Sequence, residues 1–232
     1  FLDRANEDFA RFLHDDGYAA ADNDQRRFKL FCFSPIRSQQ RKIIGDQLIL
    51  GEGEAQWIVA SPVEKFLTEF ASGLLTSAHL RVGSTVLPIC SVETLPAPNI
   101  EYSQDKPPRF KCLSPIVAAV AENRDGKSGK NWTRYLRPKD PDFSERVRAN
   151  LLRKYAAMHG HAPRDDNFIL QFDDNYLSTH RGTKLIRYKN IDIVGAFAPF
   201  TLRAAPELIE FALDCGLGEK NAGGFGLVEM LK

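Results

Sequence analysis

The chain has 232 residues, of which 43% are hydrophobic and 26% are charged, and its formal net charge is +1. This composition is ordinary for a folded protein, and no run approaches about eighteen apolar residues, so we expect no membrane span and no membrane partner. The four cysteines show no CxxC or CxC spacing. We therefore expect no zinc site, no other metal site and no cofactor, and we expect free thiols in a cytoplasmic protein.

The first 96 residues predict the element order αββαβ. Helical spacing, strand formers and a glycine-rich turn give a helix at 5–14, a strand at 26–35, strand signals around the turn at 42–61, a helix at 62–77 and a strand at 85–95. This order is a βαββαβ unit that lacks its first strand. The sequence opens without Met or a signal-peptide pattern, which fits a chain recorded from partway through its own beginning.

The second half predicts the complete unit. Apolar periodicity gives a strand at 109–120, a helix at 142–160, strands at 168–172 and at 183–202 with a turn near Asn190, a helix at 206–216 and a strand at 224–231. The order βαββαβ is the ferredoxin-like or RRM-like unit. We predict an α+β fold of two tandem ferredoxin-like domains, 1–96 and 109–232, joined by a proline-rich linker at 97–108. A single sheet of many strands is the less favoured alternative.

Positive charge is gathered in separate islands on this near-neutral chain. Residues 26–42 hold six bases and no acid, residues 124–154 hold ten bases against four acids, and residues 181–189 hold four bases and no acid. Such islands can form one track along a phosphate backbone, although each alone is better explained as a solvated face. Trp132, between cations, suits either base stacking or a core position.

The segment GLGEKNAGGFG (216–226) contains five of the sixteen glycines. It is not a Walker A loop, because Asn221 follows Lys220 where Ser or Thr is required, and a helix precedes it where a Rossmann turn has a strand. A glycine-dense connection exposes backbone N–H groups and admits a close RNA backbone. A helix C-cap followed by a β-bulge is the structural alternative.

This segment is similar to the C-terminal glycine-rich signature of the CRISPR-associated repeat-RNA endoribonucleases, the Cas six family. Four other segments resemble that family in the same order along the chain: FLHDDGY…FKLFCFSP (12–35), LSPIVAAV (113–120), YLRPKDPDFSERVRANLLRKY (135–155) and VGAFAPFTLRAAPELIEFALDCG (194–216). The resemblance implies the tandem fold and cleavage of CRISPR repeat RNA (pre-crRNA) into guide RNA without a metal ion. The expected partners are repeat RNA or crRNA and other CRISPR-associated proteins.

The resemblance also implies the catalytic groups. The 2′-hydroxyl attacks the adjacent phosphate and leaves a 2′,3′-cyclic phosphate and a 5′-hydroxyl, which requires proton transfer and positive charge. His14 matches the family's catalytic histidine, and Lys29 matches a lysine that stabilises the transition-state charge in some relatives. Some relatives also use a tyrosine of the first helix, where Phe1 and Leu2 stand here. Without the resemblance, His14 is a helix-end residue and Lys29 a solvent-facing strand lysine.

The residues expected to contact RNA lie in the glycine-rich segment and in the second basic island. They are Gly216, Gly218, Lys220, Asn221, Gly223, Gly224, Phe225, Gly226, Arg134 and Arg137. Two other functions remain open from the sequence. The chain could be a non-catalytic scaffold subunit that binds guide RNA, or the RNA-processing domain of a larger fused CRISPR protein.

Overall fold

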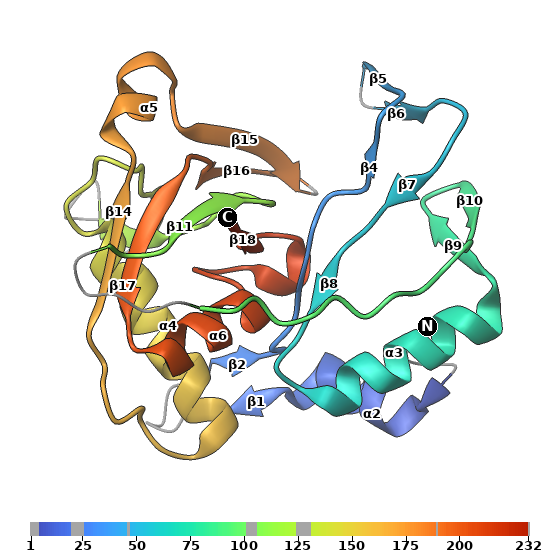
Figure 1. Cartoon of the computed structure of the whole chain (residues 1–232), viewed down its shortest axis with the longest axis horizontal. Coiled ribbons are helices and arrows are strands. Elements are labelled where there is room, and N and C mark those ends of the chain that lie inside the picture. Colours follow the sequence, from blue (N-terminus) through green and yellow to red (C-terminus); the bar gives the residue numbers. More distant parts are fainter. Residues whose placement is uncertain are drawn as a thin grey trace.

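The computed structural model describes residues 5–19, 26–45, 47–100, 106–123, 131–188 and 190–231. Figure 1 shows the second half of the chain, in green to red, beside the long blue and teal hairpin and the helices of the first half. Among the described residues, no helix is both long and apolar enough to cross a membrane.

The second half is built around one four-stranded antiparallel sheet. Its elements are β11 (Arg109–Cys112), β12 (Ala119–Asn123), β13 (Asn131–Tyr135), α4 (Phe143–His159), β14 (Phe168–Phe172), α5 (Asp174–Thr179), β15 (Thr183–Tyr188), β16 (Ile191–Ala196), β17 (Phe200–Ala204), α6 (Pro206–Cys215), η2 (Asn221–Gly223) and β18 (Val228–Met230). The strand order is β14-β17-β11-β18. The first of these strands in sequence therefore lies between the third and the fourth, which is the ferredoxin-like arrangement and confirms the unit predicted there.

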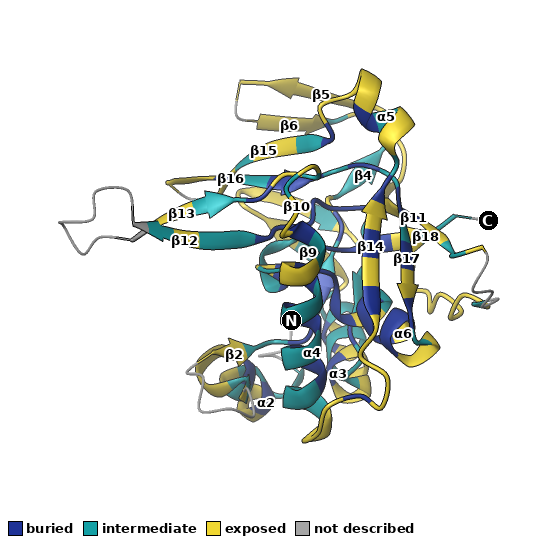
Figure 2. Cartoon of the chain, turned by 90° about the vertical axis from the view of Figure 1, so that its left-hand side faces the viewer, coloured by how far each residue is buried: buried dark blue, intermediate teal, exposed yellow. Residues whose placement is uncertain are grey.

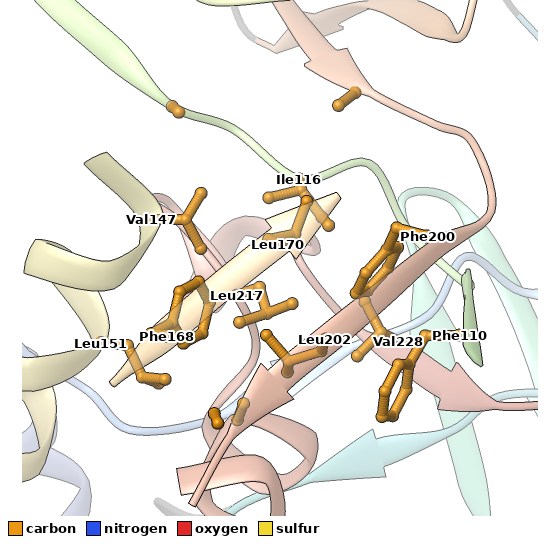
Figure 3. Close-up of a cluster of buried hydrophobic side chains, with 14 of the residues drawn as sticks. Phe110, Ile116, Val147, Leu151, Phe168, Leu170, Phe200, Leu202, Leu217 and Val228 are labelled. Carbon is orange, nitrogen blue, oxygen red and sulfur yellow. The ribbon is translucent and has the colours of Figure 1, made fainter. Parts of the chain in front are cut away.

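The core of this half lies between the sheet and the helices α4 and α6. On β14, Phe168, Leu170 and Phe172 are buried while the residues between them are exposed, because successive strand side chains point to opposite faces. Helix α4 covers that face with buried Val147 and Leu151, one turn apart. Figure 3 shows Phe168 and Leu170 meeting Val147 and Leu151 in one cluster, and Figure 2 shows the alternation along β14.

Two hairpins are added to the second unit. Hairpin β12–β13 projects from the body (Figure 2), and β15–β16 turns next to Asn190, as the sequence predicts. The single strand expected at 109–120 is wrong: β11 ends at Cys112 and β12 begins at Ala119. Pro115 lies in the gap and has no N–H to donate, and Ile116 bonds instead to Ala196 of β16.

The first half has shorter strands and a longer hairpin than the sequence predicts. Its elements are α2 (Glu7–Arg11), the π-helical turn η1 (Phe12–Asp16), β1 (Tyr18–Ala19), β2 (Arg27–Phe28), β3 (Cys32–Phe33), β4 (Arg37–Ser38), β5 (Arg41–Ile44), β6 (Gln47–Leu50), β7 (Ala55–Gln56), β8 (Val59–Ala60), α3 (Glu64–Ser77), β9 (His79–Val82) and β10 (Thr85–Pro88). Strands β3 to β8 form one ribbon through the pairs β3–β8, β4–β7 and β5–β6.

Three expectations for this half need correction. The ribbon reverses next to Gly45, whereas Gly51 donates to the Gln40 carbonyl within the ribbon. The strand expected at 26–35 is split, with buried Leu30 in the left-handed region at φ 51° between β2 and β3. The strand expected at 85–95 ends at Pro88 and pairs with β9 as a hairpin.

Candidate functional site

His14 is held on the surface of η1 by the packing of residues that precede it in the sequence. Phe9 and Leu13 are buried against Phe66 of α3, so the next residue after Leu13 faces outward. The His14 side chain is 83% exposed, and its Nδ1 lies 2.6 Å from Asp15 Oδ1. A carboxylate on one ring nitrogen fixes the orientation of the imidazole and leaves the other nitrogen available for proton transfer.

Pairing of β1 with β2 brings the segment of Lys29 beside the end of η1. Tyr18 lies opposite Phe28 in this pair. Tyr18 follows His14 by four residues, and Lys29 is the residue after Phe28. Gly17 makes the approach possible, since a Cβ there would lie 2.8 Å from the Phe28 carbonyl oxygen. Lys29 is half-buried, and Phe1 and Leu2 lie outside the described residues.

The glycine loop, residues 216–226, is mostly buried. Gly216, Gly218, Asn221, Phe225 and Gly226 are buried, whereas Gly223 and Gly224 are half-buried and Lys220 is exposed. Of the residues expected to contact RNA in this loop, only Lys220, Gly223 and Gly224 are therefore accessible to a ligand.

Backbone crowding explains the glycines of this loop. A Cβ on Gly218 would lie 2.3 Å from the Val117 carbonyl oxygen, and one on Gly226 would lie 2.0 Å from that of Leu217. Both glycines also have positive φ, at 70° and 78°. The buried Asn221 side chain donates to the Leu217 and Phe225 carbonyls at 3.2 and 3.1 Å, so the loop is closed on itself.

A buried lysine supports the loop from α4. Lys154 is 3% exposed, and its Nζ donates to the carbonyls of Gly216 and Gly218 at 2.7 and 2.9 Å. Burial lowers the pKa of Lys154, because removing water disfavours the charged amine. The sequence analysis missed this residue. The signal was a lysine on the apolar side of the predicted helix, three residues after Leu151 and seven after Val147.

The glycine loop also joins the two halves of the chain. A Cβ on Gly216 would lie 3.0 Å from Cys32 Cβ, and one on Gly224 would lie 2.7 Å from the Phe33 ring. Cys32 and Phe33 form β3, which follows Lys29 in the chain. The loop thus packs on the strand that leads away from the candidate active-site segment.

The expected arginines of the second basic island differ in their surroundings. Arg134 is half-buried and forms ion pairs with Glu122 and, at 3.4 Å, with Asp140. Arg137 is exposed, and its backbone N–H donates to Asp140 Oδ2 at 2.7 Å. Much of the Arg134 charge is opposed by carboxylates, whereas Arg137 faces solvent. Trp132 is 57% exposed and is therefore not a core residue.

Two of the basic islands meet in space although they are far apart in the sequence. Arg37 of β4 donates to the Leu113 carbonyl at 3.0 Å, and Lys184 of β15 lies 3.7 Å from the centroid of the Phe197 ring. The pKa of Lys184 is lowered, first by partial loss of solvent and then by the nearby positive charges of Arg41 and Arg37. Over the part of the chain that the structure describes, no group of three or more His, Cys, Asp and Glu side chains could hold a metal ion.

Two models of one protein family match the chain, one over each half. The family model described as "CRISPR associated protein Cas6, C-terminal" matches residues 97–230, and "CRISPR-associated protein Cas6, N-terminal" matches residues 2–92. The "CRISPR-associated endoribonuclease Cas6 1" of Methanocaldococcus jannaschii is 31% identical over 227 residues, which cover 97% of this chain and 79% of that protein. The chain belongs to the Cas6 family.

Other relatives agree with this assignment. The "Putative CRISPR-associated endoribonuclease-like protein Cas6" of Pyrococcus furiosus is 26% identical over 201 residues, covering 86% of this chain and 78% of the relative. A solved structure of "CRISPR associated protein Cas6" has a TM-score of 0.75 and 27% identity, covering 100% of this chain and 88% of that one. The structure described as "An RAMP protein binding different RNA substrates" has a TM-score of 0.71 at 21% identity and covers 100% and 87%. These matches confirm the α+β class with tandem ferredoxin-like units.

Proposed function

We propose that this Cas6 protein cleaves CRISPR repeat RNA by proton-transfer chemistry and without a metal ion. The observation that carries the proposal is the exposed His14 imidazole, which is paired with Asp15 beside the segment of Lys29. The relatives named as endoribonucleases support the reaction class. A scaffold that only binds RNA has no need of a histidine oriented by a carboxylate on its surface.

In this mechanism the 2′-oxygen forms a bond to phosphorus while the bond from phosphorus to the 5′-oxygen breaks. The proton of the 2′-hydroxyl passes to a base, and the departing 5′-oxygen receives a proton from an acid. His14 serves as one of these two groups, because an imidazole is the usual side chain for general acid or base catalysis. Asp15 orients the ring through Nδ1. Lys29 places positive charge near the phosphorane-like transition state.

The RNA backbone lies along the exposed part of the glycine loop and the basic islands. Lys220, Gly223 and Gly224 offer a charge and accessible backbone, and Arg137 offers a second charge. Arg134 contributes less, because Glu122 and Asp140 already oppose its charge. The buried members of the loop, Gly216, Gly218, Asn221, Phe225 and Gly226, act by fixing its shape.

The test is cleavage of labelled repeat RNA in excess EDTA, with analysis of the product ends. We expect undiminished cutting, a 2′,3′-cyclic phosphate on the upstream product and a 5′-hydroxyl on the downstream product. Loss of cutting in EDTA, followed by its return with Mg²⁺ or Mn²⁺, would contradict the mechanism. Binding without any cutting under all of these conditions would favour the scaffold function.

A further inference from the structure

Tyr188 ends β15 next to the glycine loop and keeps much of its ring accessible. The residue is 43% exposed, and a Cβ on Gly223 would lie 3.7 Å from Tyr188 Cε2. The Tyr188 and Phe225 rings meet edge to face, with centroids 6.5 Å apart. We propose that Tyr188 stacks on an unpaired nucleobase of the RNA whose backbone the glycine loop contacts. This subsite rests on the proposed function and adds a base contact to it.

The alternation of β15 directs Tyr188 toward the loop. Successive strand residues point to opposite faces, so Lys184, Ile186 and Tyr188 share one face. Ile186 packs on the buried cluster that contains Phe225, which identifies this face as the one that covers the loop. Leu185, between Lys184 and Ile186, points the other way and is 67% exposed.

The ring is supported by Phe225 and stays partly exposed. Phe225 is 2% exposed and fixes the edge of the Tyr188 ring by an edge-to-face contact, which is a favoured geometry for aromatic pairs. Gly223 carries no side chain, so nothing from that position extends over the ring. A tyrosine held in this way has few conformations left to lose when a flat ligand stacks on it, and a nucleobase is such a ligand.

Positive charge in the glycine loop and on the strand of Tyr188 favours RNA over an uncharged aromatic ligand. Lys220 lies in the same loop, three residues before Gly223, and is exposed. Lys184 lies on the same strand face as Tyr188, about 13 Å away at the usual rise of a strand. Arg37 and Arg41 approach Lys184, and within the described residues none of these three cations forms an ion pair with an acid.

Lys184, Arg37 and Arg41 repel one another, and a bound polyanion would reduce this repulsion. An exposed aromatic ring and several cations therefore lie on the glycine loop and the strand beside it. Single-stranded nucleic acid is recognised by this combination, with phosphates on the cations and bases on aromatic rings.

The experiment measures the affinity of catalytically inactive protein, carrying His14→Ala, for repeat RNA at several salt concentrations. Tyr188→Ala should weaken binding by about 5- to 150-fold, the usual worth of one stacked base. Tyr188→Phe should bind like the parent, and Tyr188→Leu should bind as weakly as Tyr188→Ala, because the aromatic face is what the base requires. The dependence of affinity on salt should stay unchanged in all three, since stacking releases no counterions.

Leu185→Ala is the matched control, because it removes an exposed apolar side chain from the other face of the same strand. We expect no change in affinity for this variant. A second measurement uses the His14→Ala protein, with Tyr188 intact, and repeat RNAs in which one nucleotide at a time is abasic. One position should weaken binding as much as Tyr188→Ala does, and combining that RNA with Tyr188→Ala should cause no further loss.

Four results would overturn the inference. They are unchanged affinity of Tyr188→Ala, full affinity of Tyr188→Leu, a Tyr188→Ala variant with an altered salt dependence, and an abasic series without a sensitive position. The abasic series does not depend on how any Tyr188 variant folds. Failure of the proposed function is distinguishable, because protein with the wild-type residues at positions 14 and 188 would then leave bound repeat RNA uncut, or would cut it only with Mg²⁺ or Mn²⁺, whereas the Tyr188 variants are judged by affinity alone.

Discussion

The candidate active-site segment around His14 and the glycine loop are built in opposite ways. His14 stands 83% exposed on a single turn, over a small core of Phe9, Leu13 and Phe66. The glycine loop is largely buried, and its carbonyls accept hydrogen bonds from the buried Lys154 and Asn221 side chains. The segment that carries the sharpest sequence signature is therefore the one whose residues are most constrained by packing.

This contrast separates two kinds of substitution. A change at an exposed reactive side chain removes chemistry while leaving the packing intact. A change at a buried glycine or at its hydrogen-bonding partners must first alter the fold of the loop, and RNA binding follows from that. The predictions below test this division, beginning with the largest expected effect.

His14→Ala should lower the single-turnover cleavage rate by roughly 10²- to 10⁴-fold, the usual contribution of a general acid or base. RNA affinity should change little, because phosphate contacts dominate it. The melting temperature should also change little, since the side chain is exposed. Rapid mixing with excess protein gives the rate, and filter binding gives the affinity. His79→Ala, at an exposed histidine of the same half, is the control and should cut like the wild type.

Two results would break the contrast at this position. A His14→Ala protein that cuts at the wild-type rate would remove the residue from the mechanism. A protein that loses affinity and rate in equal proportion would make His14 a contact that positions RNA.

Gly218→Ala should destabilise the protein by at least about 3 kcal/mol, from the strain of positive φ and from the contact with the Val117 carbonyl. Gly160→Ala is the matched control, because Gly160 has φ 75° and nothing within 4 Å of its Cβ position. That variant should lose only about 1 kcal/mol. Urea unfolding measures both. Equal losses would show that crowding at Gly218 is relieved by a small shift of the loop.

Lys220→Ala should weaken RNA binding and lower the slope of log affinity against log salt by about one unit, as expected for one lost phosphate contact. The fold should be unaffected, because Lys220 is exposed. Lys111→Ala is the control: that lysine is paired with Glu229 at 2.8 Å, so its removal should leave the slope unchanged. An unchanged slope for Lys220→Ala would restrict the loop to a structural role.

The sequence predicted the second half better than the first. The strand at 168–172 and the helix at 206–216 follow from alternation and from Pro206 and Gly216 at the helix ends, and the structure has β14 and α6 there. Local patterns failed where pairing decides the element, as at Pro115 and in the short strands of the first half. The domain boundaries at 97–108 and the missing first strand stay predictions.

The candidate site could be predicted only in part. The resemblance indicated His14 and Lys29, and β-pairing of Tyr18 with Phe28 brings the segment of Lys29 to the end of the turn that carries His14. Residue type alone could not show that Asn221 and Phe225 are buried, because Phe225 packs with Val117 and Ile193 from distant segments and Asn221 bonds to carbonyls of the folded loop. Lys154 was missed for the same reason: the carbonyls that it binds are 62 and 64 residues away in the chain.

The smallest predicted effect concerns Asp214, which lies where the loop meets the first half. The Cys32 thiol donates a weak hydrogen bond to the Asp214 backbone carbonyl at 3.5 Å. The residue is exposed overall, but partial loss of solvent around its carboxyl group, with a smaller contribution from the charge of Glu210, raises its pKa from 3.8 to about 6. The folded protein therefore binds this proton more tightly than the unfolded chain does.

The sign of the effect follows from linkage. The tighter binding of this proton stabilises the folded protein. This stabilisation is fully present below about pH 4, where Asp214 is protonated in both the folded and the unfolded state, and it is lost as the pH rises through about 6. At pH 7 the folded protein holds an unfavourable charge, so Asp214→Asn should be more stable than the wild type. Solvent screening reduces the gain to about 1 kcal/mol.

Urea unfolding of both proteins from pH 4 to pH 7 measures the difference, which should vanish toward pH 4. Glu210→Gln should give a smaller gain in the same direction, because it removes only the weaker cause of the shift. A less stable Asp214→Asn protein at pH 7 would mean that the carboxylate has a favourable partner. The contact between α6 and β3 would then depend on a charge, and the packing of the glycine loop on the first half of the chain would weaken in acid rather than tighten.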